Sequence, residues 1–350
     1  MSESQRRGGV SERSGRTPRM VPGDGMAHDV VTMGRVSVDL YPLQVGVPLD
    51  EVESFGKYLG GSPTNVAVAA ARYGHRTAVI TRTGADPFGR FVHRALGEYG
   101  VDDRFVTDVP GLPTPLAFCE MFPPDHFPLY FYRYPKAPDL EIYPNELDLD
   151  AIGKARIFWA TVTGLAREPS HEATLDALAA QPGTTVLDLD WRPMFWESPE
   201  QARARVGKAL EHATVAVGNL EECGVAVGER EPRAAARALL DRGVSMAIVK
   251  QGPRGVLAAT PDTMVEVPPT PVKVVNGLGA GDAFGGAVCH GLLLGWDLER
   301  IVAFASAAGA IVASRLSCAD AMPTSAEVEA MLAGEPTTGD IENTEKKAIR

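Results

Sequence analysis

The chain has 350 residues, of which 45% are hydrophobic and 23% charged, and its formal net charge is −11 at pH 7. This composition is ordinary for a globular protein and excludes collagen-like and wholly disordered chains. The acidic balance gives no electrostatic footprint for nucleic acid, and no apolar run reaches the length of a membrane span.

Residues 1–28 are rich in Arg, Ser and Gly without apolar periodicity, which predicts a disordered tail; a transit peptide is the alternative. From residue 29 to residue 333, strand-like and helix-like patterns alternate, and the polar residues 334–350 are predicted to form a flexible tail. Four scattered cysteines without a C-x-x-C pair predict reduced thiols in a cytoplasmic protein.

Strand patterns cover residues 30–34, 77–82, 157–161, 185–190, 214–217, 246–250, 256–259 and 264–267. Helix patterns cover residues 63–73 with Ser62 as N-cap, 87–100, 231–242, 280–294, 298–314 and 325–332, and three more begin at residues 170, 198 and 219. Strands that alternate with helices predict an α/β fold, in which a mostly parallel sheet has helices on both faces.

Two extended segments interrupt this alternation, at about residues 40–58 and 111–136. The second contains many prolines and the aromatic run 127–134, a combination that favours strands on an edge or flap over strands in a buried sheet. We expect the two segments to form a small β lid over the face of the larger sheet.

The most distinctive motif is Asn276-Gly277-Leu278-Gly279-Ala280-Gly281-Asp282, directly before an apolar helix. Its glycines let successive N–H groups point outward at a helix N-terminus, an arrangement that attracts phosphate. A carboxylate beside bound phosphate is explained if Asp282 takes a proton from an attacking hydroxyl. The alternative is that Asp282 only stabilises the helix N-terminus. A dinucleotide-binding fingerprint is poorly placed here, because it opens an early βαβ unit.

Two motifs carry a family resemblance. Gly60-Gly61-Ser62-Pro63-Thr64-Asn65 and Gly279-Ala280-Gly281-Asp282 resemble the two signatures of the ribokinase-like (PfkB-type) carbohydrate kinases, over roughly residues 29–333. The resemblance implies a ribokinase-like fold and ATP-dependent phosphorylation of a sugar-like hydroxyl, with ATP and Mg²⁺ as cofactors. It leaves open a K⁺ requirement and a homodimer formed through the lid.

The resemblance also implies roles for single residues. It makes Asp282 the general base, and it makes the N–H groups of Gly279, Ala280 and Gly281 the cradle for the transferred phosphoryl group. Substrate hydroxyls are assigned to Asp39 and Asn65, with Gly60 and Gly61 allowing close approach.

Nucleotide and magnesium contacts are implied elsewhere. Asn219 and Glu222 match the N-x-x-E motif of the family, in which Glu222 would organise magnesium through water; the alternative is a helix cap with a reciprocal Glu. Further nucleotide-side positions are Lys250, Gly252, Gly255, Asn276 and Ser306. Three of these depart from the residues usual in the family: Lys250, Asn276 and Ser306.

Arg133 in the aromatic segment and Arg192 after a predicted strand are candidates to bind a substrate carboxylate, because two guanidiniums allow bidentate docking. The alternative is that each pairs with an acid such as Asp188 or Asp190. This pair resembles the keto-deoxy-sugar-acid kinases of the family. The implied substrate is 5-dehydro-2-deoxygluconate of myo-inositol catabolism, phosphorylated to its 6-phosphate. Alternatives are 2-keto-3-deoxygluconate, a neutral sugar of the fructokinase or ribokinase type, and a catalytically idle sugar or nucleotide sensor.

Overall fold

The computed structural model describes residues 27–334. The predicted tails, residues 1–28 and 334–350, lie outside the described residues except at their inner ends. His28 is buried, and its ring hydrogen-bonds to Asp102 at 3.1 Å. The described fold therefore includes His28, which the sequence placed in the tail.

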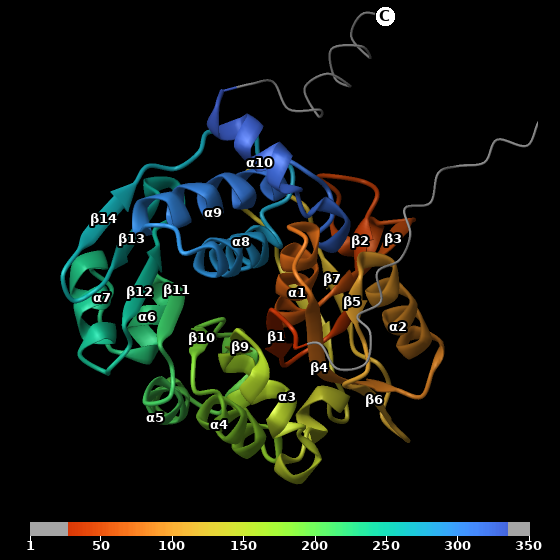
Figure 1. Ribbon diagram of the computed structural model, residues 1–350. Coiled ribbons are helices and arrows are strands. Elements are labelled where there is room, and N and C mark those ends of the chain that lie inside the picture. The colour runs from red at the N-terminus through yellow and green to blue at the C-terminus, as the bar shows by residue number, and fades with distance from the viewer. Residues whose placement is uncertain (1–26, 335–350) are drawn as a thin grey trace, which may run out of the picture.

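The larger sheet consists of β1 (Val30–Met33), β4 (Thr77–Gly84), β5 (Val101–Asp102), β6 (Val106–Val109), β9 (Ile157–Thr161), β10 (Thr184–Asp188), β11 (Val215–Asn219), β12 (Met246–Lys250), β13 (Val256–Ala259) and β14 (Met264–Val267). Their order is β14-β13-β12-β11-β10-β9-β1-β4-β5, with β6 also beside β4 (Figure 1). Neighbours are parallel except at β13, which is antiparallel to both β12 and β14. The predicted mostly parallel sheet is confirmed.

Helices cover both faces of this sheet (Figure 1). On one face lie α1 (Ser62–Arg72), α2 (Pro87–Tyr99), α8 (Ala280–Leu294), α9 (Leu298–Ala313) and α10 (Ser325–Leu332). On the other lie α3 (Leu149–Lys154), α4 (Ser170–Ala180), α5 (Pro199–Leu210), α6 (Leu220–Ala226) and α7 (Pro232–Leu240). Successive strand residues point to opposite faces. Thus Phe158 packs in one hydrophobic cluster and Trp159 in the other.

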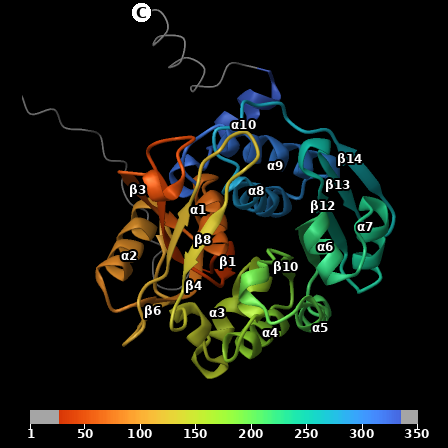
Figure 2. The same ribbon diagram turned by 180° about the vertical axis from the view of Figure 1, so that it is seen from behind.

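A second, small sheet contains β2 (Ser37–Pro42), β3 (Phe55–Gly60), β7 (Leu116–Cys119) and β8 (Leu129–Tyr132), in the order β3-β2-β7-β8. Seen from behind, β8 lies in front of β1 and α1 (Figure 2). The predicted small β lid is confirmed, although β2 and β3 extend beyond the expected 40–58 segment on both sides.

Helix α1 begins at Ser62, one residue earlier than predicted, and its N-cap is Gly61 rather than Ser62. Gly61 has φ +101°, a left-handed conformation that glycine adopts without steric cost. A Cβ at this position would lie 2.4 Å from the backbone oxygen of Arg35. A glycine backbone, and not a side-chain cap, therefore starts α1 next to β1.

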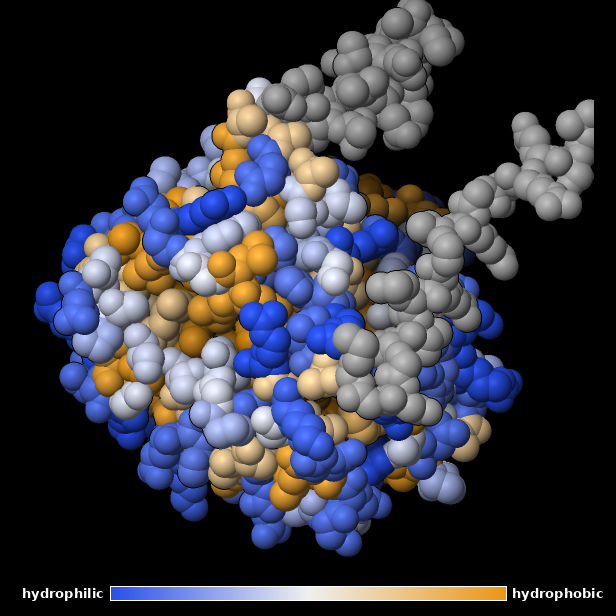
Figure 3. Space-filling view, in the orientation of Figure 1, coloured by the Kyte–Doolittle hydropathy of each residue, from blue (hydrophilic) through white to orange (hydrophobic). Residues whose placement is uncertain are grey.

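The surface is hydrophilic over most of the face in Figure 3, with smaller apolar areas between. Among the described helices, none is long and apolar enough to cross a membrane. All four cysteines are free and buried. The described fold therefore depends on its hydrophobic clusters, without a cross-link between these thiols.

Candidate active site

A cavity of about 410 Å³ lies at the carboxyl edge of the parallel sheet. Arg35 follows β1, Asp188 ends β10, and Asn219 and Lys250 end the paired strands β11 and β12; all four line the cavity. Phe131 of β8 lines it from the small sheet. Ligands of open α/β sheets bind at this edge, because all the parallel strands end there.

The loop before α8 forms one wall of the cavity. Gly279 is the N-cap of α8 with φ +78°, and a Cβ there would lie 2.6 Å from Sγ of Cys318. Asn276 holds the loop from behind: its Oδ1 accepts a hydrogen bond from the N–H of Leu278, and its Nδ2 donates to the backbone oxygen of Leu316. The hydrogen bonds of Asn276 therefore fix the loop that carries the N–H groups at the start of α8.

Asp282 lies in the first turn of α8 and lines the cavity. Its Oδ2 accepts a hydrogen bond from Nδ2 of Asn65 at 2.8 Å, across 217 positions of sequence. Burial raises the pKa of Asp282 above its ordinary value, although hydrogen bonds from Asn65 and Ser62 oppose the shift. The two sequence motifs thus meet at one partly buried carboxylate whose pKa lies above its ordinary value.

Asp39 lies on β2 beside the same cavity. Its two carboxylate oxygens accept hydrogen bonds from Oγ of Ser37 at 2.6 Å and from Oη of Tyr41 at 3.0 Å. Gly60 lies directly behind, where a Cβ would be 2.0 Å from Oδ1 of Asp39. Gly60 therefore makes room for the Asp39 side chain and does not itself line the cavity.

Five carboxylates and three cations line the cavity: Asp39, Asp188, Asp190, Glu222 and Asp282, with Arg35, Arg192 and Lys250. Asp190 pairs with two of the cations, Arg35 at 3.1 Å and Arg192 at 2.7 Å. Asp188 is different, since its buried Oδ1 has no hydrogen-bond partner among the described residues. Burial, together with the neighbouring carboxylates, raises the pKa of Asp188 well above its usual range, although Lys250 opposes the shift.

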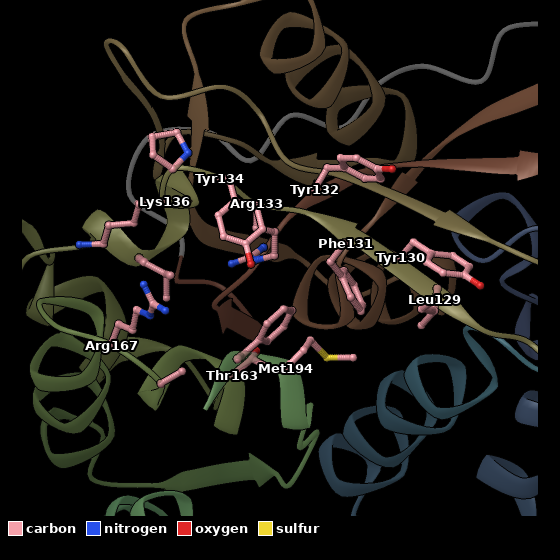
Figure 4. A pocket seen from close by; sticks show the side chains of 14 residues that line it. Leu129, Tyr130, Phe131, Tyr132, Arg133, Tyr134, Lys136, Thr163, Arg167 and Met194 are labelled. Carbon is pink, nitrogen blue, oxygen red and sulfur yellow. The ribbon is translucent and has the colours of Figure 1, made fainter. Parts of the chain in front are cut away.

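Arg133 lies outside this cavity, in a neighbouring pocket of about 360 Å³ that it lines with Lys136 and Arg167 (Figure 4). Its guanidinium is ion-paired with the buried Asp139 at 2.6 Å. The guanidinium of Arg167 has no hydrogen bond or ion pair within residues 27–334. The expectation that Arg133 meets Arg192 at a single carboxylate is therefore corrected: each guanidinium pairs with an acid in its own space.

The reason lies in the geometry of β8. Leu129 and Phe131 border both the cavity and the pocket, and Arg133 follows two residues later on the same side of the strand. The ring of Phe131 packs edge-on against Phe195, with 5.1 Å between the centroids. This aromatic pair separates the position of Arg133 from the catalytic cavity.

Of the predicted site residues, eleven line the cavity: Asp39, Gly61, Asn65, Arg192, Asn219, Glu222, Lys250, Gly252, Gly279, Gly281 and Asp282. Six lie outside it: Gly60, Arg133, Gly255, Asn276, Ala280 and Ser306. Among the six, Asn276 is fully buried and its side chain hydrogen-bonds within the loop, which supports a structural role, and a nucleotide contact at this position stays a prediction.

Asn219 and Glu222 form the helix cap that was the alternative interpretation. Oδ1 of Asn219 accepts the N–H of Glu222 at 2.9 Å, and Oε2 of Glu222 accepts the N–H of Asn219 at 2.7 Å. Both side chains nevertheless line the cavity. The cap is confirmed, and a contact with magnesium through water stays a prediction.

Three functional candidates were not predicted from the sequence: Arg35, Tyr41 and Asp188. Arg35 and Asp188 stand at the ends of parallel strands, so the rule that ligands bind at carboxyl edges offered a signal for both. Tyr41 had a local signal of another kind, because residues two apart on a strand point to the same face and Tyr41 lies two positions after Asp39 on β2.

Residues 27–325 match the family model described as pfkB family carbohydrate kinase. The chain belongs to this family. A relative named 5-dehydro-2-deoxygluconokinase, from Geobacillus kaustophilus (strain HTA426), is 35% identical to this pfkB family kinase over 310 residues, covering 86% of this chain and 92% of the relative. The predicted family is confirmed.

Solved structures agree with the fold of this pfkB family kinase. A fructokinase with bound ATP from Xylella fastidiosa has a TM-score of 0.77 at 26% identity, covering 88% of this chain and 99% of that one. A fructokinase double mutant from Vibrio cholerae O395, with fructose, ADP and potassium ion bound, has a TM-score of 0.75 at 27% identity, covering 87% and 99%. The predicted ribokinase-like fold is confirmed.

Proposed function

We propose that this pfkB family kinase transfers the γ-phosphoryl group of ATP to the terminal hydroxyl of a keto-deoxy sugar acid, with 5-dehydro-2-deoxygluconate as substrate and its 6-phosphate as product, a step of myo-inositol catabolism. One observation carries the proposal: the partly buried Asp282 carboxylate accepts a hydrogen bond from Asn65 at 2.8 Å and stands at the N-terminus of α8, in a cavity that also contains guanidiniums. The 35% identical relative named 5-dehydro-2-deoxygluconokinase supports the choice of substrate.

In this mechanism Asp282 takes the proton of the substrate hydroxyl. The hydroxyl oxygen forms a bond to the γ-phosphorus while the bond from that phosphorus to the bridging oxygen breaks, and ADP leaves with the electron pair. The raised pKa of Asp282 makes it a better base than an exposed Asp. N–H groups at the start of α8 would stabilise the negative charge on the transferred group, since phosphoryl transfer depends mainly on positioning and electrostatics.

The donor set of the cavity fits magnesium. Oδ1 of Asp188 is buried without a hydrogen-bond partner in the part of the chain that the structure describes, and the five lining carboxylates outnumber the three cations. No group of three or more acidic, His or Cys side chains within residues 27–334 forms a metal cage. Asp188 and Glu222 would therefore hold Mg²⁺ together with water and phosphate oxygens, as is usual for this ion. When bound, the ion neutralises charge on the phosphates.

A neutral sugar is the second candidate substrate, and one observation favours it. Asp190 pairs with both Arg35 and Arg192, so neither guanidinium is left without a carboxylate. A sugar acid has to share these guanidiniums with Asp190. The fructokinases of similar fold make fructose the natural comparison.

The test is ADP release with Mg²⁺ and ATP across 5-dehydro-2-deoxygluconate, 2-keto-3-deoxygluconate, fructose, ribose and adenosine. We expect the highest kcat/KM with the first compound. A preference for fructose or ribose would replace the sugar acid by a neutral sugar. Absence of ADP with all five would favour the sensor, and ATP binding by calorimetry would then show whether it binds nucleotide.

An Arg192→Ala variant tests how the carboxylate is bound. Loss of one charge-assisted hydrogen bond, about 1.5 to 3 kcal/mol, corresponds to a fall of about 10- to 150-fold in kcat/KM for the sugar acid, mostly through KM. Fructose turnover, if measurable, should change less. Arg167→Ala is the matched control, because Arg167 lines only the neighbouring pocket. If kcat/KM for the sugar acid fell further in Arg167→Ala than in Arg192→Ala, the substrate carboxylate would instead bind in the neighbouring pocket.

Four further statements stay predictions: a homodimer through the lid, activation by K⁺, a cytoplasmic location, and a kinase domain bounded by residues 29 and 333. Sedimentation analysis tests the dimer. Comparison of K⁺ with Na⁺ in the ADP-release assay tests the activation.

A further inference from the structure

Lys250 differs from the other cations of the cavity. It is the last residue of β12 and lines the cavity, yet its ammonium has no hydrogen bond or ion pair within the part of the chain that the structure describes. By contrast, Arg35 and Arg192 both pair with Asp190. Lys250 is therefore the cation of this cavity that remains available to a ligand.

The position of the ammonium indicates which class of ligand it could bind. A Cβ built on Gly281 would lie 3.5 Å from Nζ of Lys250. Nζ thus lies beside the loop that opens α8, next to the residue that precedes Asp282. An anion bound at the start of α8 would be within reach of both the loop N–H groups and the three donors of the ammonium.

The surrounding charges keep Lys250 protonated. Burial lowers its pKa, but the carboxylates of Asp188, Glu222, Asp190 and Asp282 more than offset this, and the pKa lies above its ordinary value. At neutral pH the side chain is an ammonium ion and does not act as a base. It provides positive charge in a cavity that is lined by more carboxylates than cationic side chains.

We propose that Lys250 is a catalytic residue whose ammonium binds the phosphoryl group while it passes from ATP to the sugar hydroxyl. The inference rests on the proposed kinase function and adds a residue to it. As the proton moves from the hydroxyl to Asp282 and the bridging bond to ADP breaks, the transferred group lies over the start of α8. Lys250 and the neighbouring loop N–H groups would bind its oxygens together.

A Lys250→Met variant removes the charge and keeps the length of the side chain. We expect kcat to fall about 10²- to 10³-fold, the range seen when one stabilising donor is removed, with KM for the sugar acid changed little. Lys250→Arg should recover part of the loss. Lys208→Met, on the exposed surface of α5, is the matched control and should behave as the natural protein. Thermal unfolding of each variant checks the fold.

Lys250 could instead have a purely structural role, in which its charge only offsets the nearby carboxylates. A measurement other than turnover is needed to distinguish this role from phosphoryl binding. Calorimetry would compare the affinities for Mg²⁺-ADP alone and for Mg²⁺-ADP with aluminium fluoride, which stands in for the transferred phosphoryl group. In the natural protein we expect aluminium fluoride to increase the affinity for Mg²⁺-ADP. In Lys250→Met this increase should be at least tenfold smaller, while the affinity for Mg²⁺-ADP alone should be almost unchanged. Equal losses for both ligands, or no loss, would overturn the proposal.

The two hypotheses fail differently. If the natural protein turns over none of the five compounds, the proposed kinase function fails, whatever Lys250 does. If the natural protein is active and Lys250→Met is equally active, only the role of Lys250 fails. The aluminium fluoride comparison needs no sugar, so its outcome does not depend on the identity of the substrate.

Discussion

An Asp282→Asn variant is expected to turn over the sugar acid about 10² to 10⁴ times more slowly than the natural protein, because it has lost its general base. The amide has almost the same shape as the carboxylate but cannot take a proton. The hydrogen bond between Asp282 and Asn65 shows how firmly the carboxylate is placed. The measurement is ADP release at saturating ATP and sugar acid, together with calorimetric binding of ATP, which we expect to be retained.

A helix N-terminus is stabilised by any nearby carboxylate, so this effect needs a control. Asp297 serves that purpose: it is the N-cap of α9, where its Oδ1 accepts the N–H of Arg300 at 2.9 Å, and it lies outside the cavity. Asp297→Asn should lower stability slightly and leave kcat unchanged. Equal kcat values for Asp282→Asn and the natural protein would show that Asp282 has only a structural role.

A Gly279→Ala variant is expected to lower kcat about 10²- to 10³-fold, the loss typical of a misplaced oxyanion donor. The added methyl group meets Sγ of Cys318 at 2.6 Å, and φ of +78° is unfavourable for alanine. The loop must shift, and its N–H groups move away from the transferred phosphoryl group. Single-turnover phosphoryl transfer measures this loss directly.

Gly295 offers a closely matched control. It ends the same helix, α8, with φ +67°, but an added Cβ has nothing within 4 Å. Gly295→Ala should cost about 1 kcal/mol of unfolding free energy through its backbone and leave kcat unchanged. A similar kcat for both variants would mean that the loop before α8 does not contribute to catalysis. Chemical unfolding provides the stability comparison.

Local signals predicted much of the fold. The strands β12, β13 and β14 and the helices α8 and α10 have the bounds expected from the sequence. The start of α10 depends on a capping box between Thr324 and Glu327, which both observed hydrogen bonds confirm. Such signals act within a few residues, and the sequence shows them directly.

Some strand ends differ from those predicted, because pairing with an adjacent strand outweighed the local sequence preference. The strand expected at 185–190 ends at Asp188, and the strand expected at 214–217 extends to Asn219. Asn219 pairs in register with Lys250, so the ladder to β12 extends the strand. The end of a strand depends on the hydrogen-bonding partners in the adjacent strand, and the sequence of a single segment does not show them.

By itself, the sequence determined the α/β fold, the family, and the glycine loop with Asp282, because each depends on residue types at fixed short spacings. Only the tertiary structure decided how the charges pair. Arg35 and Asp190 are 155 positions apart and meet in the cavity, whereas Arg133 turns to Asp139 behind Phe131. Ion pairs of this kind follow from the direction and packing of side chains on different elements. Only the tertiary structure shows that Lys250 is the cation available to a ligand, because the acids that surround it come from several elements that the chain folds together.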